Sequence, residues 1–356
     1  MTTRRAFLAS LLAAGTAPHM GWAAAGNPAF LAAAKERDDS FALYGLDTEG
    51  HATFRIPLPA RGHAGAGHPH RAEAVAFARR PGTFALVIDC ARGQVIHRLT
   101  PPDGVQFNGH GVFADGGATL FTSEQSGTTS QGQVGIWDVE AGYTRIGSFP
   151  TGGIGPHDLR LMPDGATLAV ANGGIATDPA DRTKLNLDAM QPNLTYLGLS
   201  RDVIQQVTLP PGLHQNSIRH LAIRADGLVG FAMQWEGAPD SATPLLGLHR
   251  IGQEATLAAA PLADELAMQG YAGSIAFSGD RRELAITSPR GGRLHRFSDT
   301  GDFLGAVSRA DICGLAPLGS GYLASDGLGG LFGIRADNRR ALDRYDCAWD
   351  NHIVTL

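Results

Sequence analysis

The sequence has little cysteine, no surplus of basic residues and no long apolar run after its N-terminal region. The three cysteines, Cys90, Cys313 and Cys347, are far apart and form neither a CxxC pair nor a CxxCH haem-attachment motif. In an oxidising compartment one pair could close and leave one free thiol. The formal net charge of −5 argues against a nucleic-acid partner. Beyond the N-terminal segment, no apolar stretch is long enough to span a membrane as a helix.

Common enzyme signatures are also missing. The sequence contains no GxSxG, no HExxH and no P-loop. Its 4 tryptophans argue against the class of quinone-dependent enzymes whose repeats usually carry tryptophan signatures. These absences leave the reaction, and whether there is one, undetermined.

What the sequence does contain is a repeated hairpin. Residues 153–174 read as a short strand, a tight turn at Pro163-Asp164-Gly165 and a second strand. Similar hairpins occur at 78–89, 113–124, 161–172, 223–234, 277–288 and 316–327. A repeat of roughly 40–50 residues made of short strands and turns is typical of a β-propeller.

The two ends of the chain complete one further blade. Residues 28–35, 41–47 and 52–58 read as the second, third and fourth strands of a blade that lacks its first. Residues 349–356, WDNHIVTL, resemble the first strand of a repeat. Pairing the last segment beside the first would seal the ring and remove its exposed edges. The sequence therefore predicts an all-β, seven-bladed propeller with a composite closing blade, formed by a single domain over residues 26–356.

The N-terminal residues 1–25 are expected to be a targeting segment. Arg4 and Arg5 are followed by Ala6-Phe7-Leu8, an apolar stretch and a small-residue cleavage site at Ala23-Ala24-Ala25. This pattern predicts a twin-arginine signal and a periplasmic protein. The alternative is a chance arginine pair before an ordinary secretory signal.

Long excursions mark one face of the predicted ring. Residues 126–131, 173–193 and 235–244 each follow the second strand of a blade, on the face where loops such as 60–69 lead into inner strands. Insertions on one face of a repeat protein usually mark its binding face. Residues 173–193 form either a lid or a solvated loop.

Polar residues recur near the start of the predicted inner strands, on this face. One column holds His110, Asp158 and His220, and His352 joins it if the terminal segment aligns with Ser217–Ala222. Imidazole and carboxylate groups together suit Fe, Cu or Zn. The sequence therefore predicts a metal site at the mouth of the channel. The alternative is that these side chains are structural latches that bond neighbouring blades or water.

Further polar residues are expected beside this site. The adjacent column contains Glu73, His157 and Arg219, of which the last two could hold an anionic part of a ligand. Glu124 ends a second strand and could form an acid/base pair with His110. His63, His68 and His70 lie in the glycine-rich stretch RGHAGAGHPH, which is either a metal-capturing segment or a flexible loop.

Several motifs resemble one bacterial family of exported proteins with a domain of unknown function. They are GHGVF (109–113), GIGPHDLRLMPDG (153–165), ANGGI (171–175), KLNLD (184–188), LHQNSIRHLAI (213–223), SPRGG (288–292) and WDNH (349–352). The resemblance spans the mature chain. It implies a periplasmic propeller linked to iron or other metal acquisition, with imelysin-type and di-haem peroxidase-like proteins as partners, and no known reaction.

The favoured function is thus a periplasmic binding or assembly protein that holds a ligand or partner on the loop face of the channel. The alternatives are a metal-dependent periplasmic enzyme, a lyase or an oxidoreductase, with a His/Asp site at the channel mouth, and an interaction scaffold without a small ligand.

Overall fold

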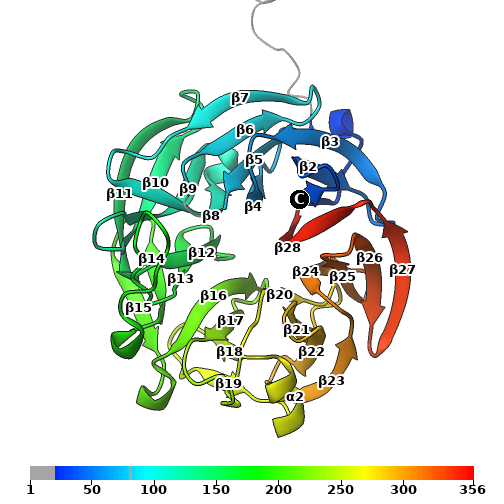
Figure 1. The fold of residues 1–356 in the computed structure, drawn as a ribbon. Helices are drawn as coiled ribbons and strands as arrows, with labels where there is room; N and C mark the ends of the chain where they lie inside the picture. The colour runs from blue at the N-terminus through cyan, green and yellow to red at the C-terminus, as the bar shows by residue number, and fades with distance from the viewer. Residues whose placement is uncertain (1–20, 80–81) are drawn as a thin grey trace, which may run out of the picture.

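The structure is a ring of seven four-stranded antiparallel sheets (Figure 1). A computed structural model describes residues 21–79 and 82–356. In each sheet the first strand lies nearest the axis and the fourth lies at the rim. The predicted seven-bladed β-propeller is confirmed.

Six of the sheets are formed by consecutive strands. In each sheet the strands are given from the axis outward. The first two sheets are β4 (Gly62–Gly67), β5 (Glu73–Ala78), β6 (Ala85–Asp89) and β7 (Gln94–Leu99), and β8 (Val105–Ala114), β9 (Thr119–Ser126), β10 (Gln131–Asp138) and β11 (Thr144–Ile154); the next two are β12 (Pro156–Leu161), β13 (Thr167–Asn172), β14 (Asn193–Gly198) and β15 (Val203–Thr208), and β16 (Asn216–Ile223), β17 (Val229–Trp235), β18 (Leu246–His249) and β19 (Thr256–Ala258). The last two are β20 (Ser274–Phe277), β21 (Glu283–Ser288), β22 (Arg293–Ser298) and β23 (Phe303–Ser308), and β24 (Ile312–Leu318), β25 (Gly321–Asp326), β26 (Gly330–Arg335) and β27 (Asn338–Arg344).

The seventh sheet joins the two ends of the chain. Its order is β28 (Cys347–Thr355), β1 (Phe30–Glu36), β2 (Phe41–Leu46) and β3 (Ala52–Leu58). Strands β1 and β28 are antiparallel, with Phe30 opposite Thr355 and Ala32 opposite Ile353. In Figure 1 the red β28 lies beside the blue strands of the N-terminal part. The predicted composite blade is confirmed.

Apolar side chains hold neighbouring sheets together. Phe77 of β5, Phe107 of β8 and Trp137 of β10 belong to one buried cluster between two adjacent blades. Burying each such side chain stabilises the fold by about 1.5–3 kcal/mol. The positions near the axis are therefore fixed by contacts farther out in the blades.

The predicted strand assignment is wrong for one repeat, the hairpin at 78–89. The expectation that residues 60–69 form a loop is wrong, because Gly62–Gly67 is the innermost strand β4 and the hairpin at 78–89 joins β5 to β6. The glycines of β4 allow close packing against the composite blade formed by the two ends of the chain. A Cβ on Gly67 would collide with Leu356, and a Cβ on Gly62 would lie 2.9 Å from the Cβ of Ala33. Because β4 has so few apolar side chains, it lacks the alternation of apolar and polar residues by which a strand is predicted from sequence.

Two of the three predicted excursions are long and lie where the sequence predicts them, whereas the third, 126–131, is only the short turn 127–130 between β9 and β10. One more long segment is present. Residues 173–192 join β13 to β14, and 236–245 join β17 to β18. The segment 259–273 between β19 and β20 was not expected and contains the short helix α2 (Leu262–Ala267). Among residues 21–79 and 82–356, no helix is long and apolar enough to cross a membrane.

Most of the expected targeting segment, including Arg4 and Arg5, lies outside the described residues. The remainder forms a 3₁₀ turn, Trp22–Ala25, and the Trp22 indole donates a hydrogen bond of 2.9 Å to the carbonyl of His68. Removal of residues 1–25 stays a prediction. The three cysteines are free thiols in the structure, and Cys90 and Cys313 are buried.

Candidate metal centre

Five histidines meet on the axis of the ring, each from the innermost strand of a different sheet. The centroids of contacting rings are 4.5 to 6.0 Å apart. In four of them, one ring nitrogen from each lies within 4.8 Å of the others. We call the five the histidine cluster: His63 of β4, His110 of β8, His157 of β12, His220 of β16 and His352 of β28. His63, His110, His157 and His352 form the close set.

Irregular strand pairing aims these side chains at the axis. The register shifts between Phe107 and Gly111 in β8, between Pro156 and Leu159 in β12, and in β4, β16 and β28 at the corresponding places. A β-bulge turns a strand locally and redirects the side chains at that point. The two remaining inner strands supply the buried Ser274 of β20 and Cys313 of β24 instead of histidine.

A glycine makes room for one of the rings. Gly109 has a φ of +95°, and a Cβ there would lie 2.5 Å from the His63 ring. Only a residue without a side chain combines this backbone conformation with so close a contact. Gly109 therefore lets β4 and β8 bring His63 and His110 together.

Carboxylates stand behind two of the histidines. Nδ1 of His110 lies 3.2 Å from Asp158, and Nδ1 of His63 lies 3.4 Å from Asp350. Asp158 also accepts hydrogen bonds from the backbone N–H of Leu221 at 3.0 Å and from Arg160 at 3.2 Å. A carboxylate that holds Nδ1 leaves Nε2 free to face a metal, as in many histidine-ligated metal sites.

Both carboxylates are held in their charged form. Burial alone would raise the pKa of Asp158, but Arg160 and His110 outweigh it and keep the pKa well below its usual range. The same opposition lowers the pKa of Asp350 to about 2, where burial is outweighed by His63 and Arg61. Asp158 and Asp350 are thus anions locked in place next to the cluster.

Three of the imidazoles are held neutral. Burial lowers the pKa of His63 to about 4, and burial together with the neighbouring imidazoles lowers those of His220 and His352 well below 6.5. Neutral imidazole is the form that binds metal ions.

Several ring nitrogens in the cluster are buried without a hydrogen-bond partner. They are Nε2 of His110, Nε2 of His352, Nδ1 of His220 and both ring nitrogens of His63, whose Nδ1 lies beyond hydrogen-bond distance from Asp350. An unsatisfied buried polar atom costs about 1–3 kcal/mol, so a group of them facing one point indicates a missing ligand.

The cluster opens onto a cavity on the face that carries the long excursions. This cavity has a volume of about 210 Å³ and is lined by His63, His157 and His220 at its base. Residues of the 173–192 and 236–245 segments and Tyr271 form its walls. The excursions therefore surround the access route to the histidines.

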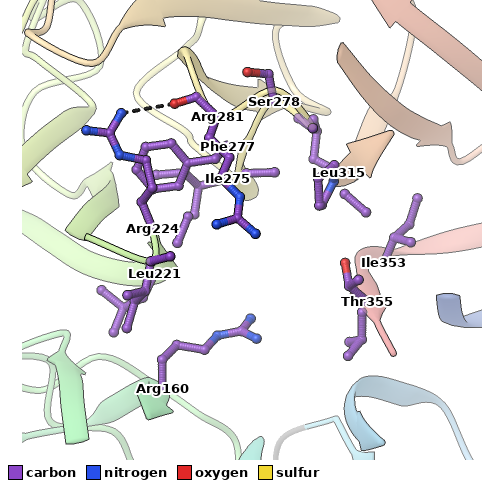
Figure 2. A pocket seen from close by; sticks show the side chains of 18 of the residues that line it. Arg160, Leu221, Arg224, Ile275, Phe277, Ser278, Arg281, Leu315, Ile353 and Thr355 are labelled. Atoms are coloured by element: carbon purple, nitrogen blue, oxygen red, sulfur yellow. Dashed lines mark hydrogen bonds between the residues drawn. The ribbon is translucent and has the colours of Figure 1, made fainter. Parts of the chain in front are cut away.

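A wider cavity of about 720 Å³ lies on the other side of the cluster (Figure 2). It is lined by residues one to three positions beyond the histidines on the same inner strands, among them Arg160, Leu221 and Ile353. In Figure 2 the guanidinium of Arg160 extends into it, opposite Ile353 and Thr355. Since Arg160 also bonds Asp158, a short path of polar groups leads from this cavity to His110.

The structure brings together most of the residues proposed as a metal site, with two changes of position. His110, His220 and His352 lie in the cluster, and His157, expected beside it, is one of its close set. Asp158 lies behind His110 instead of facing the centre, because the bulge in β12 turns the two neighbours differently. His63 was missed as a cluster member because its strand was taken for a loop.

The other expected site residues lie elsewhere. Arg219 lines the smaller cavity. Glu73 is on the second strand β5 and accepts a hydrogen bond of 2.7 Å from Tyr143. Glu124 is fully buried and bound by Arg145 of β11 at 2.7 and 2.8 Å, so its carboxylate turns toward the rim of the blade and away from His110. His68 and His70 do not join the cluster; the ring of His68 packs on Phe113.

Comparison with known proteins adds a family and a fold. A family model described as "Protein of unknown function (DUF1513)" matches residues 56–356. A search of curated proteins gave no match. Among solved structures, the chain resembles hydrazine synthase from Kuenenia stuttgartiensis with a TM-score of 0.60 and 13% identity, covering 86% of this chain and 89% of that chain. At this identity the likeness concerns the fold alone.

Proposed function

We propose that this chain, which belongs to the DUF1513 family of proteins of unknown function, binds a transition-metal ion on its histidine cluster. One observation carries the proposal: four histidine nitrogens from four separate blades lie within 4.8 Å of one another in a buried site. Ligand nitrogens lie about 2.0–2.1 Å from a zinc ion, so two ligands of a tetrahedral site are about 3.4 Å apart. Small rotations of the side chains would close the remaining difference.

A purely structural role for these histidines explains the site less well. If the histidines only joined neighbouring blades, their ring nitrogens would make hydrogen bonds, whereas Nε2 of His110 and Nε2 of His352 have no partner. Asp158, in contrast, lies at Nδ1 of His110, and Asp350 lies 3.4 Å from Nδ1 of His63, as carboxylates do behind the histidine ligands of many metal sites. The structural interpretation therefore leaves the free-energy cost of these unsatisfied nitrogens, which metal binding would remove.

The donor set limits which metal fits. Imidazole donors suit Zn, Cu, Fe and Ni, whereas Mg and Ca prefer oxygen ligands. The donors therefore agree with Fe, Cu or Zn, the ions expected from the sequence, and exclude Mg and Ca.

We place this binding outside the cytoplasm, in iron or other metal acquisition. The support is the Arg4-Arg5 signal pattern and the resemblance of the sequence motifs to exported proteins found with imelysin-type and di-haem peroxidase-like partners. The role would be that of a binding or assembly protein that holds a metal or a metal complex on its loop face.

A metal-dependent enzyme is the second candidate. It is favoured by the cavity of about 210 Å³ that reaches His63, His157 and His220, because a catalytic metal needs an open position for a substrate. Turnover of a substrate by the metal-loaded protein, and not by the metal-free protein, would favour this candidate.

Metal analysis of the purified, untagged protein tests the proposal. We expect close to one equivalent of a transition metal, and loss of most of it in His110→Ala and His352→Ala, because each variant removes a donor of the close set. His51→Ala, in an exposed turn, is the matched control and should retain the metal. Thermal unfolding of the metal-free proteins separates the alternatives. If the two variants lose stability but keep the metal content of the control, the histidines are latches and the proposal is wrong.

A further inference from the structure

The cavity above the histidine cluster is strongly cationic. Among the described residues that line it, Glu236 is the one carboxylate. The cationic side chains are Arg79, Arg182, Lys184, Arg219 and Arg290. They come from different parts of the chain, so the fold gathers them at this point.

Arg219 is the most informative of these cations. It belongs to β16, its side chain is 11% exposed, and its Nε has no hydrogen-bond partner. Its nearest carboxylate, Glu236, is 3.9 Å away and is already bound by Lys184. A buried guanidinium normally holds a carboxylate or phosphate through two parallel hydrogen bonds, and here that partner is missing.

The neighbouring cations add to this unbalanced charge. Burial first, and then Arg79, lowers the pKa of Arg182, and burial lowers that of Arg219, with Arg182 adding to the effect. Like charges gathered in a partly desolvated space repel one another unless an anion lies between them. Arg290 is fixed nearby, with its guanidinium 4.4 Å from the centre of the Tyr271 ring.

We propose that this cavity binds a small multivalent anion whose carboxylate or phosphate oxygens bridge Arg182 and Arg219 above the histidines. Its volume of about 210 Å³ is below that of typical sites for drug-sized ligands and fits a small molecule. His63, His157 and His220 line the same cavity, so the far end of the anion would face the cluster. The anion site does not depend on a metal, because its cations come from other residues.

Calorimetric titration of the full chain with citrate and with inorganic phosphate, at low ionic strength, tests the anion site. The protein is first freed of metal with a chelator, and the chelator is removed. We expect binding of one anion per chain, weakened by salt because the contacts are ionic. Tighter binding of citrate would assign a polycarboxylate, and tighter binding of phosphate would assign a phosphate compound.

Two variants and one control complete the test. Arg182→Gln, at an exposed position of the 173–192 segment, and Arg219→Gln should each weaken binding at least tenfold. Arg335→Gln, exposed at the end of the outer strand β26, removes the same charge and should leave the affinity unchanged. If neither anion binds the folded protein, with or without metal, or if Arg182→Gln binds as well as the control, the anion site is refuted. Metal content in the histidine variants is a separate readout, so the two proposals can fail independently.

Discussion

Two carboxylates decide which nitrogen two of the channel histidines present to the centre. Asp158 and Asp350 are charged and almost fully buried, and each lies at Nδ1 of a histidine. A proton on Nδ1 faces the carboxylate, which leaves the lone pair of Nε2 directed away from it. Asp158 thus sets the tautomer of His110 before any metal arrives, and the nearby charge of Asp350 favours the same tautomer of His63.

A buried carboxyl group outside the site gives a pH-dependent prediction. Glu265 of α2 is 7% exposed, and burial raises its pKa to about 7. Its unfolded pKa is about 4.3, so the folded state holds the proton more tightly than the unfolded state. The stabilisation is complete below about pH 4.3 and is lost as the pH rises through about 7.

Glu265→Gln should remove this pH dependence. The glutamine stays neutral and can still accept the hydrogen bond from the N–H of Ala260. We expect the metal-free variant to be more stable than the metal-free wild type by about 1–3 kcal/mol at pH 8, and the gain to vanish below about pH 4. Denaturant unfolding at the two pH values measures this, with the exposed Glu254→Gln as control. An equal difference at both pH values would contradict the assignment.

The candidate site was predictable from the sequence to the extent that strands are regular. His110, His220 and His352 share a register across the repeats, and they lie together in the structure. His157 and Asp158 are neighbours, and strict alternation would send only one of them inward. The bulge in β12 changes which one faces the centre, and a bulge of this kind has no signature in a single sequence.

At the scale of the strands, the seam between β1 and β28 is the element on which the ring depends. Ile353 of β28 is 6% exposed and packs in one cluster with Trp349 and with side chains of β1 and β2. Removing the strand would expose this cluster, which includes side chains of the neighbouring β24, and would leave an open edge on β1.

Deleting residues 349–356 should therefore cause aggregation or a large loss of stability. Ile353→Ala is the milder form of the test and should cost about 2–5 kcal/mol, because it leaves a cavity in a buried cluster. Thr355→Ala, exposed on the same strand, should change the free energy of unfolding by less than about 0.5 kcal/mol. A deletion variant that melts like the full chain would refute the role of the seam.

The strand pattern also shows which strands a single sequence predicts and which it does not. The sequence predicts five of the six repeated hairpins on the correct strands, because in each a tight turn leads from the inner strand into a largely buried second strand. In the remaining blade the predicted hairpin lies one strand too far from the axis, because β4 contains only glycine, alanine and one histidine and does not read as a strand. Its strand conformation comes from pairing with β5 and from packing at the seam, which are tertiary effects.

At the scale of the molecule, the ring places the cluster between two cavities. The smaller is rimmed by the long excursions, and the larger opens at the far ends of the inner strands. Membership of a family of unknown function, expected from the motifs, is confirmed by the match over residues 56–356. The compartment in which the ring works stays a prediction from residues 1–25.

Replacing Arg4 and Arg5 by Lys tests that compartment. The twin-arginine pathway needs the arginine pair, so we expect the doubly substituted precursor to remain in the cytoplasm. Arg37→Lys, on the surface of the ring, is the control and should not alter export. Fractionation followed by immunoblotting measures the distribution. Normal arrival of the double variant in the periplasm would refute the twin-arginine assignment.

The seam has a consequence for how the chain folds. Strands β1 and β28 pair residues more than 300 positions apart, such as Phe30 and Thr355, so ring closure brings together the most distant contacts in the described chain. Closing so long a loop carries a large entropic cost, and contacts of this range form late. His352 lies in β28, so the donor set is complete only after this last step. An ion held by His352 and by histidines of three other blades would then cross-link the closed ring and slow its reopening, which makes the rate of unfolding a direct measure of metal occupancy.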